Sequence, residues 1–314
     1  MSTTVYQRIE GGVLGLLIGD AVGVPYEFHP PQALPPIDQI DMTPPRGFAR
    51  AHVGVPPRTW SDDGAQALIL LDSLLANDGL DLRHFAEGLR RWLHEGFFAV
   101  NRSVFDVGAQ TSTAINRLVA GAPPEASGPA TEQHNGNGSL MRVLPLALWH
   151  TGDDAALVSL AMRQSLPSHG HPRSQACCAL YCLWARAALR GHHAAWDWAV
   201  ERLHELAPEA GLDAAEVALV TAPDNAASIR GSGYVLDTLW SARASVLAGE
   251  DYAGCVRAAI ALGHDTDTTA CVAGGIAGII HGAAGIPAEW RDGLRGRELL
   301  APLLEGLLAR YPAG

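Results

Sequence analysis

Apolar residues recur along most of this chain at the spacing of amphipathic α-helices. In the segment 65–77, for example, Leu68, Leu71 and Leu75 fall on one stripe. We find no period-two alternation bounded by turns and no internal repeat. The sequence therefore predicts an all-α fold, a single compact domain over residues 1–314, with helices over 5–24, 65–77, 81–94, 108–120, 142–149, 155–164, 173–190, 194–206, 214–220, 234–247, 251–262, 270–285 and 294–311.

Two segments depart from this simple pattern. The first helix contains several glycines, each costing a helix roughly 1 kcal/mol against alanine, which favours close approach by another helix or a ligand. Residues 30–58 contain paired prolines, and their apolar residues follow neither the helical nor the strand period. Long loops in compact domains are usually functional or disordered, and the interspersed apolar residues favour an ordered lid here.

A polar motif interrupts the apolar C-terminal third. Residues 265–269 hold two carboxylates and three hydroxyls in five consecutive positions. One interpretation is a helix cap, with Asp265 or Thr266 at the N-cap and Asp267 in the first turn. The other is a metal site, because a second acidic group at an apparent helix start, Ser61-Asp62-Asp63, occurs far upstream. Oxygen ligands of this kind suit Mg, Mn or Ca rather than zinc.

Other polar positions stand next to glycines. The turn 135–139, Asn-Gly-Asn-Gly-Ser, offers backbone amides for a phosphate, although such sequences also occur in ordinary turns. His169 and His171 have a spacing that a transition metal accepts, but nothing nearby supports such a site. Asp20 and Glu27 are either functional acids or the solvated end of the first helix.

Charge and cysteine content narrow the function class. The formal net charge is −11, which argues against nucleic acid or an anionic membrane as the main partner. The five cysteines are an odd number, three lie in an apolar helical run, and buried free thiols favour a reducing compartment. Residues 1–10 lack the pattern of a signal peptide, and no apolar run of membrane-spanning length is free of Gly, Asp or His. We therefore expect a cytoplasmic, monomeric protein.

The motifs occur together in an order that resembles one family, the ADP-ribosylglycohydrolases. The resemblance covers nearly the whole chain, and the Asp-Asp and Asp-Thr-Asp-Thr pair is its most specific part. It is carried by Gly19-Asp20-Ala21-Val22-Gly23 with Glu27, Trp60-Ser61-Asp62-Asp63, Gly136-Asn137-Gly138-Ser139 with Met141-Arg142, His169 with Pro172, Gly231-Ser232-Gly233-Tyr234-Val235, and Asp265-Thr266-Asp267-Thr268.

The resemblance implies an all-helical orthogonal domain with two divalent cations, Mg²⁺ or Mn²⁺, in a central cleft. It implies metal ligands at Ser61, Asp62, Asp63, Asp265, Asp267 and Thr268, and catalytic roles for Glu27, Asp62 and Asp267. The implied substrate-binding residues are Gly136, Asn137, Gly138, Ser139, His169, Gly233 and Tyr234. The charges balance, because Asp62, Asp63, Asp265 and Asp267 supply four negative charges for two divalent ions.

The activity that the resemblance implies is hydrolysis of the glycosidic bond between ADP-ribose and its acceptor, on an ADP-ribosylated protein or another conjugate, with ADP-ribose as product. Arginine, serine, a nucleobase or a small molecule remain open as acceptors, at a cleft rim formed by the lid and residues 101–113. An ADP-ribose-binding module without turnover, or a structural protein on the same fold, would be expected to lose ligands, and none is lost.

Four positions depart from the family pattern, and the first is Ser61, where a threonine is usual. Gly64 stands where a threonine is usual, His171 where Asp is frequent, and His264 where a smaller residue is common. Ser61 keeps the ligand oxygen, whereas Gly64 removes a second hydroxyl near the acids. We expect His264 to influence substrate choice.

Overall fold

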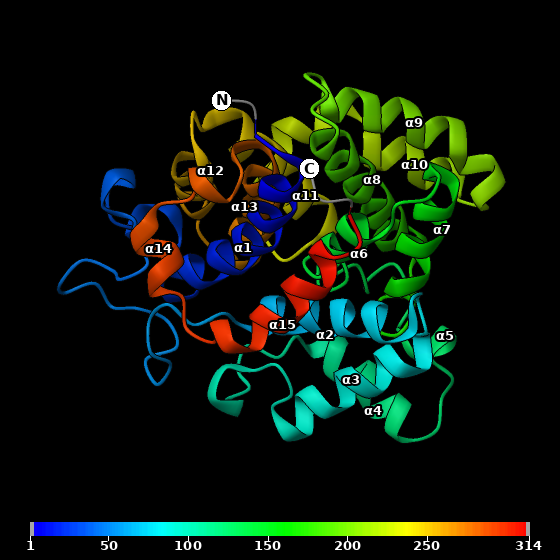
Figure 1. The fold of residues 1–314 in the computed structure, drawn as a ribbon, viewed down its shortest axis with the longest axis horizontal. Coiled ribbons are helices and arrows are strands. Elements are labelled where there is room, and N and C mark those ends of the chain that lie inside the picture. The colour runs from blue at the N-terminus through cyan, green and yellow to red at the C-terminus, as the bar shows by residue number, and fades with distance from the viewer. Residues whose placement is uncertain (1–2, 312–314) are drawn as a thin grey trace.

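The computed structural model describes residues 3–311 and is all-α, which confirms the predicted fold class (Figure 1). Within this range there is no strand, and the only β contact is an isolated bridge between Gly136 and Tyr234. The α-helices are α1 (Val5–Gly23), α2 (Asp62–Asn77), α3 (Leu82–Glu95), α4 (Ala109–Val119), α5 (Pro124–Ser127), α6 (Leu144–Trp149), α7 (Asp154–Ser165), α8 (Pro172–Leu189), α9 (Ala195–Ala210), α10 (Ala214–Thr221), α11 (Val235–Ala248), α12 (Tyr252–Ile260), α13 (Thr266–His281), α14 (Ala288–Gly293) and α15 (Arg297–Leu308).

The predicted helices match these elements, with differences where the chain turns. The short helices α5 and α14 were not predicted, because a segment of four to six residues is too short to show a period. Helix α15 begins at Arg297 rather than 294, because Gly296 has a left-handed φ of 78°. Helix α6 begins only at Leu144, after the glycine-rich turn.

Helices α1 and α13 form a tightly packed pair at the centre of the molecule (Figure 1). Glycines of α1 lie against glycines of α13, and their backbones touch. A Cβ at Gly278 would lie 2.6 Å from the carbonyl carbon of Gly11, and a Cβ at Gly19 would lie 2.7 Å from that of Ala270. The glycines of the first helix therefore serve helix packing, which is one of the two uses that the sequence predicted.

The segment Val5–Tyr26 is long and apolar enough to cross a membrane by length and composition, although glycines and Asp20 interrupt it, as expected from the sequence. In the structure, 94% of its apolar window is buried inside the protein. The rest of the chain therefore packs around this segment, which is a core helix of the fold.

The proline-rich segment forms an ordered loop without α-helix, in which only two short 3₁₀ turns, Pro31–Ala33 and Ile37–Gln39, occur. Ile40 and Met42 are buried in the core. Trp290 of α14 donates a hydrogen bond of 2.8 Å to the Asp41 carboxylate. The loop is therefore attached to the C-terminal helices, and the five cysteines are free and buried as expected.

Candidate functional site

The N-termini of α2 and α13 bring acidic side chains together that are about two hundred residues apart in sequence. One carboxylate oxygen each of Asp20, Asp63 and Asp267 lies within 4.8 Å of the others, and all three residues are buried. Thr268 Oγ1 lies 3.4 Å from Asp63 Oδ1. The structure thus places Asp63, Asp267 and Thr268, which come from both predicted acidic motifs, in one cluster with Asp20.

Asp20 connects this cluster to the first helix. Its carboxylate accepts hydrogen bonds from the backbone N–H of Ser61, at 2.9 and 3.0 Å, and of Gly64, at 2.8 Å. The side chain is fully buried, so the solvated helix end that the sequence left open for Asp20 is wrong. Asp20 holds the start of α2 against α1, because it satisfies N–H groups that have no partner inside the helix.

Burial raises the pKa values of these acids. The pKa of Asp20 is raised to about 7, mainly by burial, although the two backbone hydrogen bonds oppose the shift. Burial also raises the pKa values of Asp62, Asp63 and Asp267 well above their usual range, and the neighbouring carboxylates add to the shift. A cation among these groups would offset both effects.

Two unpartnered oxygens show that the cluster fits a cation. Oδ2 of Asp63 and Oδ2 of Asp267 are buried and have no hydrogen-bond donor among residues 3–311. A buried carboxylate oxygen without a partner is costly, and buried charges are paired or coordinate metals. The atoms of this cluster that could bind a metal ion are all oxygens, and Mg²⁺ and Mn²⁺ prefer oxygen ligands.

The remaining predicted metal ligands take different positions. Asp62 lines the cleft, and its Oδ2 accepts a hydrogen bond of 3.0 Å from Gln66. The Ser61 hydroxyl caps α2 by accepting from the N–H of Asp63 at 3.3 Å, so its oxygen is shared with the helix end.

Asp265 occupies the N-cap position of α13 but makes no capping hydrogen bond. Its Oδ2 instead accepts a bond of 2.8 Å from Asn137 Nδ2 in the glycine-rich turn. It also lies within 4.8 Å of Glu27 and Asp267. The capping interpretation is therefore wrong for the Asp265 side chain, which faces the cleft.

Glu27 follows α1 and is only 4% exposed, so it is not a solvated loop acid. Its Oε2 lies 2.5 Å from Nε2 of His52, which belongs to the proline-rich loop. Burial raises the pKa of Glu27 to about 8, against the effect of the His52 hydrogen bond. That same bond raises the pKa of His52.

Asp106 completes this side of the cleft. Its carboxylate lies within 4.8 Å of Glu27 and His52, and burial raises its pKa. Its backbone φ is 53°, an uncommon value for a residue with a side chain. Sequence reasoning placed residues 101–113 at the cleft rim but did not identify Asp106, because a single acid between apolar residues carries no local signal.

The glycine-rich turn forms the opposite wall of a cavity of about 270 Å³. Gly136, Asn137, Gly138, His169 and Gly233 line it together with Glu27, Asp62, Asp106, Asp265 and Thr268. The N–H of Asn137 donates to the Gly233 carbonyl at 3.1 Å, and the N–H of Val235 donates to the Asn135 carbonyl at 2.9 Å. The two glycine motifs of the sequence are thereby joined into one edge of the cleft.

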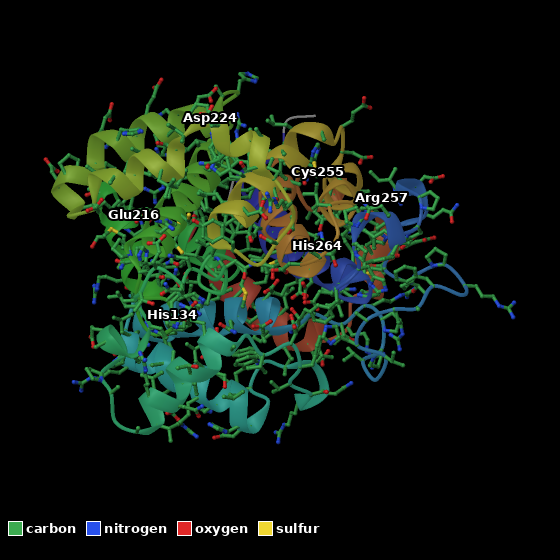
Figure 2. The ribbon with its side chains drawn as sticks, turned by 180° about the vertical axis from the view of Figure 1, so that it is seen from behind. His134, Glu216, Asp224, Cys255, Arg257 and His264 are labelled. Atoms are coloured by element: carbon green, nitrogen blue, oxygen red, sulfur yellow. The ribbon has the colours of Figure 1, made fainter. Side chains whose placement is uncertain are left out.

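His169 lies behind this turn and is almost fully buried. Burial lowers its pKa well below the usual range, so its imidazole is neutral. Its Nδ1 lies 2.8 Å from the Ser168 hydroxyl. A Cβ at Gly138 would come within 2.8 Å of the ring, so only glycine fits there. Figure 2 shows His264 near the middle of the view, and His134, three residues before Asn137, below and to its left.

Two predicted substrate contacts lie outside the cavity wall. The Ser139 hydroxyl is fully buried and accepts from Ser165 at 2.9 Å, so it supports the turn from behind. Tyr234 stands at the rim, 37% exposed, and its hydroxyl accepts from Arg173 at 3.0 Å. Arg173 also holds Glu216, which Figure 2 labels on the left of the view, through two bonds of 2.8 and 3.0 Å.

The departures at positions 64 and 264 have structural reasons. A Cβ at Gly64 would lie 2.7 Å from Leu17 and 2.8 Å from Trp60, so the packing here excludes a larger residue. His264 has a φ of 61°, and its backbone exchanges two hydrogen bonds of 2.7 Å with Phe28 and His29. These bonds tie the loop that carries Glu27 to the loop that carries Asp265.

The chain is similar to known proteins over its full length. The sequence model of the ADP-ribosylglycohydrolase family matches residues 1–313. The "ADP-ribosylarginine hydrolase Tri1" of Pseudomonas putida (strain GB-1) is 30% identical, over 97% of this chain and 79% of that protein. The "ADP-ribosyl-[dinitrogen reductase] glycohydrolase" of Rhodospirillum rubrum is 27% identical, over 91% of this chain and 90% of that protein. A solved structure described as "ADP-ribosylglycohydrolase-related protein complex" has a TM-score of 0.77 at 31% identity, covering 97% of this chain and 98% of that one.

Proposed function

The chain belongs to the ADP-ribosylglycohydrolase family, and on that premise we propose that it is a metal-dependent hydrolase of the glycosidic bond between ADP-ribose and its acceptor. The observation that carries the proposal is the pair of unpartnered carboxylate oxygens, on Asp63 and Asp267, beside the glycine-rich edge. A protein that only bound ADP-ribose would not need buried carboxylates, whose burial is unfavourable without a cation. The products are ADP-ribose and the free acceptor.

The cleft offers a separate surface for each part of the substrate. The diphosphate fits the backbone amides of the turn 136–138, since glycines allow close approach and N–H groups favour anions. The adenosine extends along Gly233 toward Tyr234. The ribose that carries the acceptor then lies over the acidic cluster, which places the scissile bond between Glu27 and Asp267.

Two divalent cations, Mg²⁺ or Mn²⁺, are the group that this cluster would hold, through Asp62, Asp63, Asp265, Asp267, Thr268 and the Ser61 hydroxyl. When bound, such cations supply Lewis acidity that orients hydroxyl groups and activates water. Asp20 holds the start of α2 against α1, and Asn137 orients the Asp265 carboxylate toward the cleft.

Glu27 is placed to move a proton in this reaction. His52 bonds Oε2, which leaves Oε1 free of that bond, and Glu27 lines the cleft. A carboxyl group whose pKa is about 8 in the metal-free protein retains a proton that it can give to the leaving acceptor. After giving that proton to the leaving acceptor, Glu27 is a carboxylate, so it can then accept a proton from the attacking water.

We propose a guanidinium group as the acceptor at the mouth of the cleft. Glu27 and Asp106 line the cavity on the acceptor side, and both offer carboxylate oxygens to a cation. Two relatives at 29–30% identity carry the description ADP-ribosylarginine hydrolase. We therefore favour arginine over serine or a nucleobase.

The test is release of free ADP-ribose from a protein ADP-ribosylated on arginine, measured with Mn²⁺, with Mg²⁺ and with EDTA. The proposal expects release with either metal and none with EDTA. A parallel substrate modified on serine separates the acceptors. Binding of ADP-ribose without release under any metal condition would instead establish a binding module.

A further inference from the structure

A second cavity, of about 380 Å³, lies at the opposite ends of the helices that carry the acidic cluster. Arg8 in the first turns of α1 and Ile280 at the end of α13 line it. Arg8 is twelve residues from Asp20, about 18 Å along a helix, and Ile280 is thirteen residues from Asp267, about 20 Å. The cavity is therefore separate from the proposed active site.

Two tryptophans, Trp184 and Trp196, line one wall of this cavity, and Trp240 packs against Trp196 beside it. The rings of Trp184 and Trp196 are 5.1 Å apart and perpendicular, and Trp240 continues the edge-to-face series at 5.1 Å from Trp196. Arg243 lies over this wall, 5.1 Å from the Trp196 ring and 5.0 Å from the Trp240 ring. The stacked aromatics hold the guanidinium in place.

Arg243 has no anionic partner in the part of the chain that the structure describes. No carboxylate lies within ion-pair distance of it, and its Nε is buried without an acceptor. Leaving a buried donor of a charged group unsatisfied is unfavourable, and the Nε–Nη edge of arginine matches a carboxylate or phosphate. Arg243 is half-buried and lines the cavity, so its guanidinium group is open to an acceptor from outside the chain.

The surroundings add a second positive charge. Arg8 donates through Nη1 to the carbonyls of Ala188 and Ile279, at 3.3 and 3.2 Å, and forms no ion pair within residues 3–311. Asp197 is the one carboxylate among the lining residues and is exposed. An adjoining hollow of about 240 Å³, which shares Trp196, Asp197 and Arg243 with this cavity, also contains Glu201, so the anion is expected on the Arg8 side.

The rest of the cavity is apolar, and part of it faces solvent. Leu247 is 70% exposed and Ile280 is 38% exposed, although both lie beside the tryptophan wall. The volume is within the range of small-molecule sites, about 300–1,000 Å³. A ligand with a flat apolar body would cover these side chains while its charged end meets Arg243.

We propose that this cavity binds a small organic anion, with a carboxylate or phosphate on Arg243 and an aromatic body against Trp196 and Leu247. The site lies in a chain whose net charge is −11, so a local pair of guanidinium groups is the feature that attracts an anion. The proposal is independent of the hydrolase activity.

The experiment is calorimetric titration of the full chain with 2-naphthoate, with acetate and 2-naphthol as probes of the charge and of the ring alone. We expect saturable binding of one 2-naphthoate, at least tenfold tighter than either control probe and undiminished by saturating ADP-ribose. Arg243→Gln should weaken it at least tenfold. The matched control Arg83→Gln, at an exposed position on α3, should leave it within twofold.

Several results would overturn the proposal. The first is a 2-naphthoate affinity no higher than that of 2-naphthol. The others are displacement of 2-naphthoate by ADP-ribose and an equal 2-naphthoate affinity in Arg243→Gln and the wild type. If Arg243→Gln does not fold, Leu247→Glu decides, because this exposed position tolerates the change and places a negative charge at the mouth. It should weaken binding at least threefold, and an unchanged affinity would refute the site.

Discussion

The close contact between the glycines of α1 and α13 predicts that Gly278→Ala destabilises the protein. A Cβ at this position would lie 2.6 Å from the Gly11 carbonyl carbon and closer still to its oxygen, where ordinary contacts begin at 3.4 Å, so the helices must separate by more than about 0.8 Å. The atoms it meets belong to the backbone and cannot rotate away. Overpacking costs about 1–3 kcal/mol, and a backbone clash belongs at the upper end.

Alanine also brings a gain, because it is about 0.5–1 kcal/mol better than glycine inside a helix. The net expectation is a loss of about 2 kcal/mol in the free energy of unfolding. The assay is urea unfolding followed by circular dichroism, with the midpoint and slope fitted together.

Gly306→Ala is the matched control. Gly306 also lies near the end of its helix, α15, but its added Cβ would meet only the movable Leu75 Cδ1, at 3.2 Å. This variant should be as stable as the wild type or more so. If the free energy of unfolding of Gly278→Ala lies within about 0.5 kcal/mol of the wild-type value, α1 and α13 are not in backbone contact and the reasoning is wrong.

Four further predictions concern the acidic site. Asp267→Asn should abolish release of ADP-ribose and weaken Mn²⁺ binding in titration calorimetry; full activity would remove Asp267 from the ligand set. Glu27→Gln should lower the turnover rate more than tenfold, about 1.4 kcal/mol of barrier, while ADP-ribose affinity stays within threefold; turnover within twofold of the wild type would exclude a catalytic role. In EDTA the Glu27 pKa of about 8 lies above its value in the unfolded chain, so this residue contributes stability at acidic pH that is lost as the pH rises through 8. Glu27→Gln should therefore match the wild-type melting temperature at pH 5 and exceed it at pH 8.5. A wild type that melts at a higher temperature than Glu27→Gln at pH 8.5 would contradict the pKa. Asp20→Ala leaves the N–H groups of Ser61 and Gly64 without acceptors, which should cost about 2–6 kcal/mol in urea unfolding, whereas an exposed change such as Asp38→Ala should cost almost nothing.

Much of the fold could be predicted from the sequence because helical period is a local property. The stripe Leu68, Leu71 and Leu75 predicted α2 without knowledge of its neighbours, and the structure begins that helix only three residues earlier. The short helices α5 and α14 were missed because their positions depend on packing rather than on a repeat.

The candidate site was predicted in part for the same reason. Asp62, Asp63, Asp265 and Asp267 stand at helix starts, where two acidic motifs in an apolar chain are visible in sequence. Asp20 had no such signal, since a lone acid among glycines fits a solvated helix end equally well. Only the structure shows that it accepts hydrogen bonds from the start of α2.

Contacts between remote segments were decided by tertiary structure alone. His52 meets Glu27 because the proline-rich loop folds back over the end of α1, and Asp106 joins them from a third segment. The Asn137 amide turns the Asp265 side chain away from its helix and into the cleft. Composition and spacing determine which helices form and which residue types are available, since these depend on near neighbours. The distance between carboxylates on different helices depends on how closely backbones such as those of α1 and α13 can pack, and that is a property of the assembled core.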